Sequence, residues 1–279
     1  TDGNKFIPAA IKKGSKIIIS EIKFKEYQDG VLYIKTQNVR KLLAEVAFKI
    51  YHKIPKNLIA VTGTNGKSSI ADFYYQILNL NQKKVASIGT LGVRANSFNF
   101  DLNNTTTDPI KLGKILKKLK SKRIDNVIME ASSHGLKQNR LDGLRFKTGI
   151  FTNLSQDHLD YHKNLKNYLK AKLYLFENLI EKKGNVITDK NLIEFNKIKK
   201  ITSRKNLNLQ AIDDYKNNFK LLSHKYDDEV QILKIKYNSL IKEINLNLIG
   251  KVQIKNILMA MIAAKKSNID FKDILNVIS

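Results

Sequence analysis

The segment VTGTNGKSSI, residues 61–70, carries the residue types that can hold a nucleotide phosphate. The residues that can contact a phosphate are, in order, Gly63, Thr64, Asn65, Gly66, Lys67, Ser68 and Ser69. Glycines let the backbone approach an anion closely, and the N–H groups at a helix start face it. Lys67 can reach the β- and γ-phosphates, and the Ser68 hydroxyl can bind Mg²⁺. The spacing is shorter than the general phosphate-loop pattern, so an ordinary strand–turn–helix with an exposed lysine is the alternative.

Glu130 ends the apolar segment NVIME, which predicts a buried strand. Open α/β sheets bind ligands at the carboxyl ends of their strands, and a carboxylate near a triphosphate is a natural Mg²⁺ ligand. A carboxylate on a surface loop is the alternative. Downstream, Ser132, Gln138 and Arg140 can contact an anionic or sugar substrate, although each alone is also typical of an ordinary loop.

Two further residues can do chemistry. His158 follows another predicted strand and can bind a metal or transfer protons, although a lone histidine is more often structural. His134 and His162 are interpreted as structural. Lys172 lies among apolar residues in the helical segment YLKAKLYLF. Spacing alone favours a lysine that extends to solvent over one with a lowered pKa.

These residues need a scaffold, and the chain predicts an α/β fold. From residue 57 onward, apolar strand-like segments alternate with amphipathic helical ones, which predicts a central doubly wound, mostly parallel sheet. Residues 1–53 predict a small, partial α/β unit whose last helix is capped by Asn38. Segments in 205–248 alternate like antiparallel strands, and residues 251–266 predict a helix. The expected domains are therefore 1–53 and 54–279.

Composition excludes several classes of protein. The 279 residues contain no cysteine, so disulfides and thiolate chemistry are excluded. No apolar run is long enough for a membrane span, so we expect a cytoplasmic protein without membrane contact. The net charge is +25, yet six of the 50 basic residues are arginine and the lysines are spread along the whole chain. Because base and bidentate phosphate recognition favour arginine, we expect no nucleic-acid partner.

Four blocks in fixed order resemble the Mur ligase family of ATP-dependent amide-bond-forming enzymes. The blocks are GTNGKSS, NTTTDP, MEASSHGLKQNR and FTNLSQDHLDYH…YLKAK. The family has a shorter phosphate loop, as this chain does. The blocks are most similar to the branch that adds diaminopimelate or lysine to a UDP-N-acetylmuramoyl-dipeptide. The resemblance implies a monomer that uses ATP and Mg²⁺ to form an acyl phosphate, which the amine of the incoming diamino acid attacks.

The resemblance also implies roles for individual residues. Lys67 stabilises the transferred phosphoryl group within a nucleotide site formed by residues 63–69 and Asn256. Ser68 and Glu130 bind one Mg²⁺, and Glu130 shares a second with His158. Lys172 corresponds to a lysine that CO₂ carbamylates, which reverses the interpretation from spacing and makes it an oxygen ligand for the metal. Contacts to the muramoyl substrate are implied for Thr105, Thr106, Ser132, Gln138 and Arg140.

Two positions depart from the family pattern. Thr107 stands where proline is common, and Gln253 replaces an asparagine near Asn256, which affects the adenine side of the site. Both chain ends look cut, so we expect the family's C-terminal domain, which selects the amino acid, to be missing and residues 1–279 alone to show little turnover. Three alternatives stay open. They are another ligase of the superfamily such as folylpolyglutamate synthase, a phosphate-loop kinase or NTPase, and a basic nucleic-acid-binding protein.

Overall fold

An eight-stranded sheet forms the centre of the computed structural model, which describes residues 3–212, 219–227, 230–247 and 250–278. The strand order is β11-β10-β9-β4-β8-β5-β6-β7. The six strands from β11 to β5 are parallel, and β6 and β7 add an antiparallel edge. The predicted mostly parallel sheet is confirmed. The strands are β4 (Asn57–Thr62), β5 (Val85–Gly89), β6 (Gly92–Ala95), β7 (Phe98–Phe100), β8 (Asn126–Glu130), β9 (Phe146–Phe151), β10 (Ile180–Asp189) and β11 (Asn208–Ile212).

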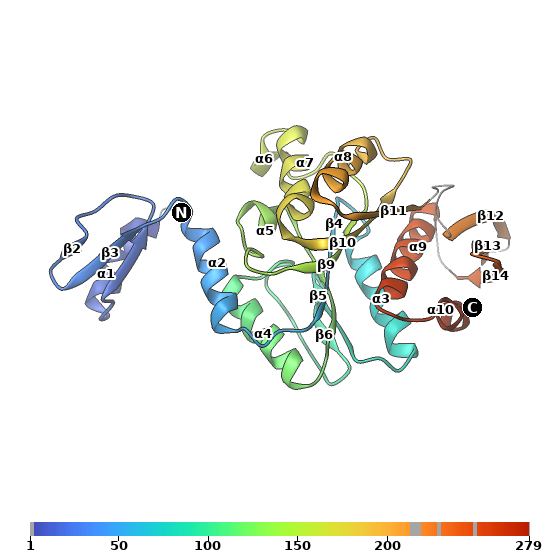
Figure 1. Cartoon of the computed structure of the whole chain (residues 1–279), viewed down its shortest axis with the longest axis horizontal. Coiled ribbons are helices and arrows are strands. Elements are labelled where there is room, and N and C mark those ends of the chain that lie inside the picture. The colour runs from blue at the N-terminus through green and yellow to red at the C-terminus, as the bar shows by residue number, and fades with distance from the viewer. Residues whose placement is uncertain (1–2, 213–218, 228–229, 248–249, 279) are drawn as a thin grey trace.

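Helices cover both faces of this sheet (Figure 1). Alternate residues of β4 show why: Ile59 and Val61 join the core on one face, whereas Leu58 and Ala60 join the core on the other. A strand that is buried on both faces is apolar throughout, as predicted for a doubly wound sheet. One face carries α3 (Lys67–Leu80), α9 (Lys251–Lys266) and α10 (Phe271–Ile278), and the other carries α2 (Val39–Ile50), α4 (Pro109–Ser121), α7 (Leu165–Tyr174) and α8 (Phe195–Lys205).

Side-chain caps explain where several helices begin. Asn38 accepts a hydrogen bond from the Lys41 N–H at 2.9 Å, which confirms the predicted cap of α2. Asp108 caps α4 in the same way, ahead of Pro109, a residue that favours the first helical position. Two short helices, α5 (Ser133–Lys137) and α6 (Leu159–His162), follow β8 and β9. In the described residues, no helix is long and apolar enough to cross a membrane.

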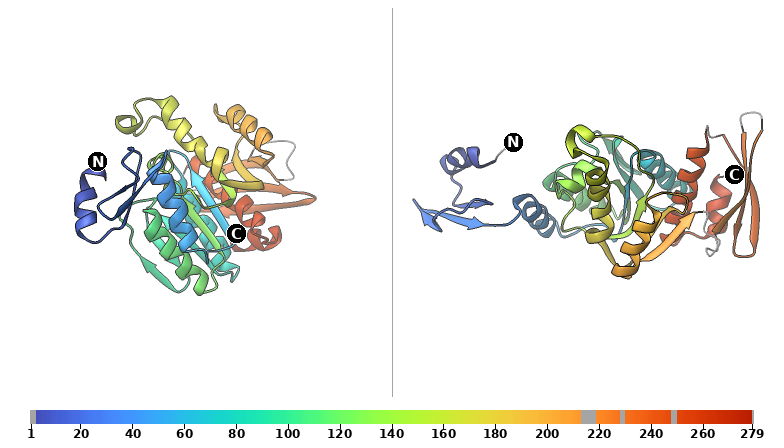
Figure 2. Two further views of the ribbon diagram at one scale, coloured as in Figure 1. Left: turned by 60° about the vertical axis from the view of Figure 1, so that its left-hand side comes forward. Right: turned by 90° about the horizontal axis from the view of Figure 1, so that it is seen from above.

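The N-terminal unit is a small α/β layer that lies apart from the central sheet (Figures 1 and 2). It contains a 3₁₀ turn (Gly3–Phe6), α1 (Ile7–Lys12), β1 (Ile17–Ser20), β2 (Tyr27–Gln28) and β3 (Val31–Lys35), with strand order β1-β3-β2. Helix α2 connects this unit to the central sheet and packs against α4. Tyr51, directly after α2, lies so close to Gly113 of α4 that a Cβ added to Gly113 would be 2.4 Å from the Tyr51 ring. Helix α2 therefore joins the core of the central unit, and the boundary at residue 53 stays a prediction.

A third sheet, which is antiparallel, contains β12 (Phe219–Asp227), β13 (Val230–Tyr237) and β14 (Leu240–Leu246). Its apolar face shares a core with α9 and α10 through residues such as Leu233 and Ile244. The prediction of antiparallel strands within 205–248 is correct here, but it is wrong for β11, which pairs with β10 in parallel. Residues 213–218, 228–229 and 248–249 of that range lie outside the described residues.

One predicted helix ends earlier than expected. The pattern of residues 164–180 predicts a single helix, but α7 ends at Tyr174 and a π-helical turn follows at Leu175–Leu179. Strand β10 then begins at Ile180. The apolar residues of the turn, such as Phe176, are buried against the sheet, so tertiary packing rather than helical periodicity determines this junction.

The chain order creates a switch point beside β4. After β4 the chain continues to β5, with β8 between them, and later passes from β8 to β9 on the opposite side of β4. In open α/β sheets, ligands bind outside the carboxyl ends of the strands at such a point. The segments that leave β4, β8 and β9 begin at residues 63, 131 and 152, so the topology brings three of the four motif blocks to one edge.

Candidate active site

The phosphate loop, residues 63–66, is held by the segment that follows β9. The Thr64 N–H donates to the Asn153 carbonyl and the Asn65 N–H to Asn153 Oδ1, both at 3.0 Å. Thr152 Oγ1 donates to the Asn65 carbonyl at 2.6 Å. Helix α3 begins at Lys67, and the N–H groups of any first helical turn lack acceptors within the helix. The loop therefore places free donors at the helix start, as an anion site requires.

Two glycines of this loop have no room for a side chain. A Cβ on Gly63 would lie 1.8 Å from Thr152 Oγ1. Gly66 has a φ of +85°, and a Cβ there would lie 2.5 Å from Asn256 Oδ1. Asn256 is buried in α9 and packs against Gly66, although the two residues are distant in sequence. The Asn256 Nδ2 donates to Gln253 Oε1 at 3.0 Å. The glutamine that differs from the family pattern therefore contacts the asparagine that agrees with it.

Lys67 and Lys172 meet at one carbonyl oxygen. Lys67 Nζ donates to the carbonyls of Gly63, at 3.1 Å, and Thr64, at 2.7 Å. Lys172 Nζ donates to the same Gly63 carbonyl at 2.6 Å, and its side chain is only 1% exposed. The prediction from spacing, that Lys172 extends to solvent, is therefore wrong. The side chain points into the site from α7 instead.

Burial makes both ammonium groups unfavourable. It lowers the pKa of Lys67, against the opposing charges of Glu130 and Asp157. Burial, together with the positive charge of Lys67, lowers the pKa of Lys172 to about 7. A substantial fraction of Lys172 is consequently a neutral amine near neutral pH, which is the form that reacts with electrophiles.

The lowered pKa predicts the pH at which Lys172 reacts. As the pH rises through about 7, Lys172 loses its proton and becomes a nucleophile. Exposed lysines do so near pH 10.4. We expect the rate of trace acetylation of Lys172, followed by peptide mass spectrometry on the ligand-free chain, to reach half its maximum near pH 7. Exposed Lys117 of the same sample is the internal reference. A profile of Lys172 that matches the profile of Lys117 would contradict this expectation.

Glu130, at the end of β8, faces the phosphate loop. Ser68 Oγ donates to Glu130 Oε1 at 2.9 Å, and the Thr90 N–H donates to the same oxygen at 2.9 Å. Thr90 Oγ1 donates to Glu130 Oε2 at 3.2 Å. The carboxylate is 3% exposed, so it is buried and directed by three donors. It is not the surface-loop carboxylate that was the alternative.

The pair of Ser68 and Glu130 fits Mg²⁺ that is bound together with phosphate. Mg²⁺ takes one or two carboxylates in proteins and completes its shell with phosphate oxygens and waters. Within the described ranges, no group of three or more His, Asp or Glu side chains is placed to hold a metal. The donor set therefore suits a nucleotide-bound metal and does not form a metal cage made of protein alone.

Gly89 leaves the space that Glu130 occupies. A Cβ on Gly89 would lie 2.1 Å from Glu130 Oε1. We expect Gly89→Ala to displace the carboxylate from Ser68 and to weaken Mg²⁺-dependent nucleotide binding about tenfold or more, while metal-free nucleotide binding changes little. Titration calorimetry of ADP with and without Mg²⁺ measures both. Equal losses with and without the metal would show that the substitution acts on the loop rather than on Glu130.

A small cavity of about 130 Å³ is lined by all four predicted catalytic residues. Tyr168, Thr90 and Ser133, which sequence reasoning missed, also line it. His158 lies at its rim: its side chain is half exposed, with Nε2 3.4 Å from Asp157 Oδ2. The shared Mg²⁺ of Glu130 and His158 stays a prediction. The lining residues are Lys67, Ser68, Thr90, Thr105, Glu130, Ser132, Ser133, His158, Tyr168 and Lys172.

The five predicted substrate residues differ in their accessibility. Thr105 and Ser132 line the small cavity, whereas Thr106, Gln138 and Arg140 do not. Thr106 is buried; its Oγ1 donates to the Glu130 carbonyl at 2.8 Å and accepts from the Ser132 N–H at 2.9 Å. The Thr106 hydroxyl is therefore already used to join the loop to the end of β8.

Arg140 is held beside these residues. Its guanidinium donates to the Thr106 carbonyl at 2.5 Å and to Gln138 Oε1 at 2.8 Å. Gln138 Nε2 in turn donates to the Tyr161 hydroxyl at 3.1 Å. These contacts arrange Arg140 and Gln138 as one polar unit next to the cavity, and their contacts to substrate stay predictions.

A cluster of histidine and tyrosine rings lies next to the site. The sequence did not predict this cluster. The ring centroid of His134 lies 4.9 Å from that of His158 and 5.5 Å from that of His162. Burial is the main cause that lowers the pKa of His134, and it lowers the pKa of His162 to about 4. His158 directly precedes α6 and His162 ends it, and the His162 N–H donates to the His158 carbonyl at 3.0 Å. The spacing of four residues was the available signal. The rings of His134 and His162 pack against each other and against Tyr161, and their structural interpretation stays a prediction.

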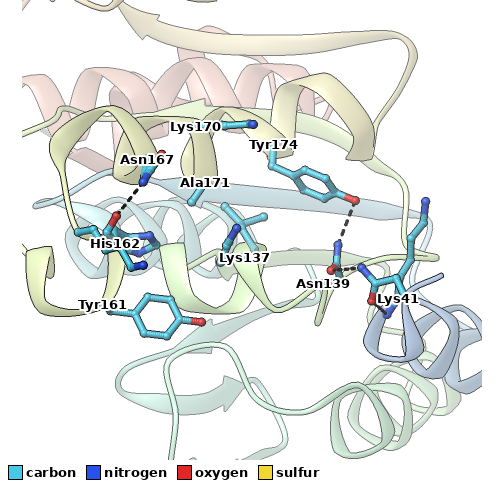
Figure 3. Close-up of a pocket in the computed structure, with 12 residues that line it drawn as sticks. Lys41, Lys137, Asn139, Tyr161, His162, Asn167, Lys170, Ala171 and Tyr174 are labelled. Carbon is cyan, nitrogen blue, oxygen red and sulfur yellow. Dashed lines mark hydrogen bonds between the residues drawn. The ribbon is translucent and has the colours of Figure 1, made fainter. Parts of the chain in front are cut away.

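A larger cavity, of about 730 Å³, lies beside α7 (Figure 3). In the close-up, Tyr161 and His162 lie toward one end, and Asn139, Tyr174 and Lys41 lie toward the other. Asn139 Nδ2 donates to the Tyr174 hydroxyl at 3.2 Å. The phosphate loop does not line this cavity, so it is separate from the small cavity that contains Lys172.

The fold and the site define an α/β protein with a phosphate-loop-like segment and a candidate nucleotide site at the carboxyl edge of a doubly wound sheet. Residues 61–264 match the family model described as the Mur ligase middle domain. The chain belongs to the Mur ligase family. The predicted resemblance is therefore confirmed.

Known relatives agree with this assignment. The UDP-N-acetylmuramoyl-L-alanyl-D-glutamate–2,6-diaminopimelate ligase of Rickettsia montanensis is 36% identical over 280 residues, covering 99% of this chain and 58% of the relative. A solved structure of a ligase with the same name has a TM-score of 0.84 at 23% identity, covering 98% of this chain and 56% of that one. The apo form of L. casei FPGS has a TM-score of 0.68 at 14% identity, covering 86% and 66%.

The sequence relatives and the solved structures support different conclusions. Both structural similarities lie below 25% identity and support the fold alone. The chain spans about 58% of the length of the Rickettsia relative, so the activity of a whole ligase is a proposal for this chain.

Proposed function

We propose that this chain provides the nucleotide site and part of the substrate site of an ATP-dependent amide-bond ligase. The ligase adds 2,6-diaminopimelate to UDP-N-acetylmuramoyl-L-Ala-D-Glu. The relatives at 34 to 36% identity are named for this reaction. The main structural support is the convergence of Lys67, Glu130 and Lys172 on one small cavity at the carboxyl edge of the sheet.

The first step is the transfer of a phosphoryl group to a carboxylate. The D-glutamyl carboxylate of the substrate attacks the γ-phosphorus of ATP, so an acyl phosphate and ADP form. Lys67, which donates to loop carbonyls in the free protein, can turn to the phosphate and stabilise its charge. Mg²⁺, when bound by Ser68 and Glu130, neutralises phosphate charge. Gly63 and Thr64 are buried and Lys67 and Ser68 are only partly exposed, so limited contact with water strengthens the electrostatic effect of these groups.

The second step forms the amide bond. The amine of diaminopimelate attacks the acyl carbon, and phosphate leaves from the tetrahedral intermediate. The residues near this position, Thr105 and Ser132 on the cavity wall and Arg140 behind them, are proposed to hold the substrate so that its carboxylate points toward the phosphate loop.

Lys172 is proposed to carry a carbamate. Its neutral amine can attack CO₂, forming an N–C bond and releasing one proton, and the product is a carbamate anion. This change replaces a cation by an oxygen ligand of the kind that Mg²⁺ prefers. The lowered pKa of Lys172 supports the proposal because only the neutral amine reacts.

Binding measurements distinguish this function from the alternatives. We expect the chain to bind ADP with Mg²⁺ and, separately, UDP-N-acetylmuramoyl-L-Ala-D-Glu, as measured by titration calorimetry. Folate is the matched competitor because the fold also resembles L. casei FPGS. Binding of folate without binding of the muramoyl substrate would overturn the proposal, and so would ATP hydrolysis that is independent of any carboxylate substrate. Amide product, detected by mass spectrometry with all three substrates present, tests the complete reaction.

A further inference from the structure

Tyr168 contacts both Lys172 and the phosphate loop. It lies one helical turn before Lys172 on α7, so the two side chains share one face of the helix. Lys172 Nζ lies 4.2 Å from the centroid of the Tyr168 ring. The hydroxyl of Tyr168 lies 3.3 Å from Thr64 Oγ1 in the loop, within hydrogen-bond distance. The side chain is 1% exposed, so these contacts are shielded from solvent.

The Tyr168 ring packs against the Lys172 nitrogen without carrying a charge. In the described part of the chain, Lys172 Nζ contacts a carbonyl oxygen and an aromatic face but forms no ion pair. A carboxylate in the place of the ring would hold the side chain as a fixed ammonium ion. An aromatic face attracts a cation yet also packs against a neutral amine. The ring can therefore keep the nitrogen in place whichever form the amine has.

The hydroxyl meets a residue that is itself anchored. Thr64 Oγ1 accepts a hydrogen bond from the Ser155 N–H at 3.0 Å. The Thr64 backbone carbonyl is also one of the two acceptors of Lys67 Nζ. The hydroxyl of Tyr168 thus contacts the residue of the loop that holds Lys67 in the free protein, and the ring of Tyr168 contacts Lys172. No other residue of the small cavity joins these two lysines from the side of α7 within the described residues.

We propose that Tyr168 is a positioning residue that ties Lys172 to the phosphate loop. Its ring sets the place of the Lys172 nitrogen, and its hydroxyl braces Thr64 for nucleotide binding. The second part rests on the proposed function, because it assumes that the loop binds a nucleotide. The first part does not, since the place of Lys172 can be measured in the free chain.

The experiment separates the ring from the hydroxyl. Tyr168→Phe keeps the ring and removes the hydroxyl, whereas Tyr168→Leu removes both. Trace acetylation with acetic anhydride, read by peptide mass spectrometry, reports how well Lys172 is covered, with the exposed lysines of the same chain as references. Titration calorimetry with ADP reports the loop. Tyr174→Phe is the matched control: it removes a hydroxyl on the same helix, which donates to Asp142 Oδ1 at 2.6 Å and does not contact the loop.

We expect Tyr168→Phe to leave the acetylation of Lys172 within about twofold of the wild type and Tyr168→Leu to raise it about fivefold or more. Both should weaken ADP binding about two- to tenfold, the effect of one lost hydrogen bond. Tyr174→Phe should change neither quantity. Adding Tyr168→Phe to Thr64→Val should weaken ADP binding no further, because the two hydroxyls form one contact.

Acetylation of Lys172 that is the same in Tyr168→Leu and the wild type would overturn the role of the ring, provided that both chains unfold cooperatively at similar temperatures. If Tyr168→Leu does not fold, acetylation of Lys172 in Tyr168→Phe that rises well above twofold overturns it instead. ADP affinity that is equal in Tyr168→Phe and the wild type would overturn the role of the hydroxyl. A wild-type chain that binds no nucleotide would contradict the proposed function and the role of the hydroxyl, while the acetylation result would still decide the role of the ring.

Discussion

Lys67→Ala is expected to reduce phosphoryl transfer by about 10² to 10³-fold, the usual effect of removing one preorganised donor from developing charge. Affinity for ADP should fall about tenfold or more, because the ammonium group of Lys67 lies against two carbonyls of the loop and can turn from them to a bound phosphate. Calorimetry with ADP measures the affinity, and carboxylate-dependent ADP formation measures the transfer.

The stability of the Lys67→Ala chain should not fall in parallel. Burial lowers the pKa of Lys67, which means that the folded protein disfavours its charged form. Removing the ammonium group relieves this cost, and the Gly63 carbonyl still accepts from Lys172. We therefore expect an unchanged or higher melting temperature together with lost function. Such a separation is typical of a residue that is kept for activity at the expense of stability.

Lys117→Ala is the matched control for Lys67→Ala. Lys117 is an exposed lysine of α4 and changes the net charge by the same amount. If both substitutions weaken ADP binding equally, the effect comes from general charge in a chain of net charge +25 rather than from the loop. If Lys67→Ala binds ADP like the wild type, the loop is not a phosphate site.

The parts of the fold that were predicted from sequence have local causes. Strand β4, helix α3 and the glycine loop between them are adjacent in the chain, so periodicity and glycine placement suffice to predict them. Glu130 could be placed at a strand end for the same reason. The edge hairpin of β6 and β7 was missed, because its strands are short and pair only with the edge of the sheet. The direction of β11 also depends on pairing with β10, which no local pattern encodes.

The site was harder to predict than its scaffold. The contact of Asn256 with Gly66 joins residues 190 positions apart, and the contact of Lys172 with the Gly63 carbonyl joins residues 109 apart. From spacing alone, Lys172 was expected to reach solvent, and only the family resemblance indicated otherwise. Burial of a lysine depends on what packs around its helix, so the helical pattern of α7 cannot reveal it. Tyr168 was overlooked because a tyrosine on an amphipathic helix is usually core.

Lys172→Ala is expected to lower carboxylate-dependent ADP formation about a hundredfold or more, because it removes the proposed carbamate oxygens from the cavity. Exposed Lys170, two residues away on the same helix, is the control: Lys170→Ala should keep activity within about twofold, the usual range for a surface substitution. Activity of Lys172→Ala that equals the activity of Lys170→Ala would show that Lys172 has no part in the reaction.

Restoration by a small acid distinguishes a carbamate from an amine role. Lys172→Ala leaves space in a buried position, and acetate or propionate can enter it and supply a carboxylate in place of the carbamate. We expect millimolar acetate to restore part of the ADP formation and also the affinity for Mn²⁺ in the presence of ADP, followed by electron paramagnetic resonance. Methylamine restores a cation instead. If methylamine restores activity and acetate does not, Lys172 acts as an ammonium ion and the carbamate is wrong; if acetate alone restores both quantities, the position requires an oxygen ligand.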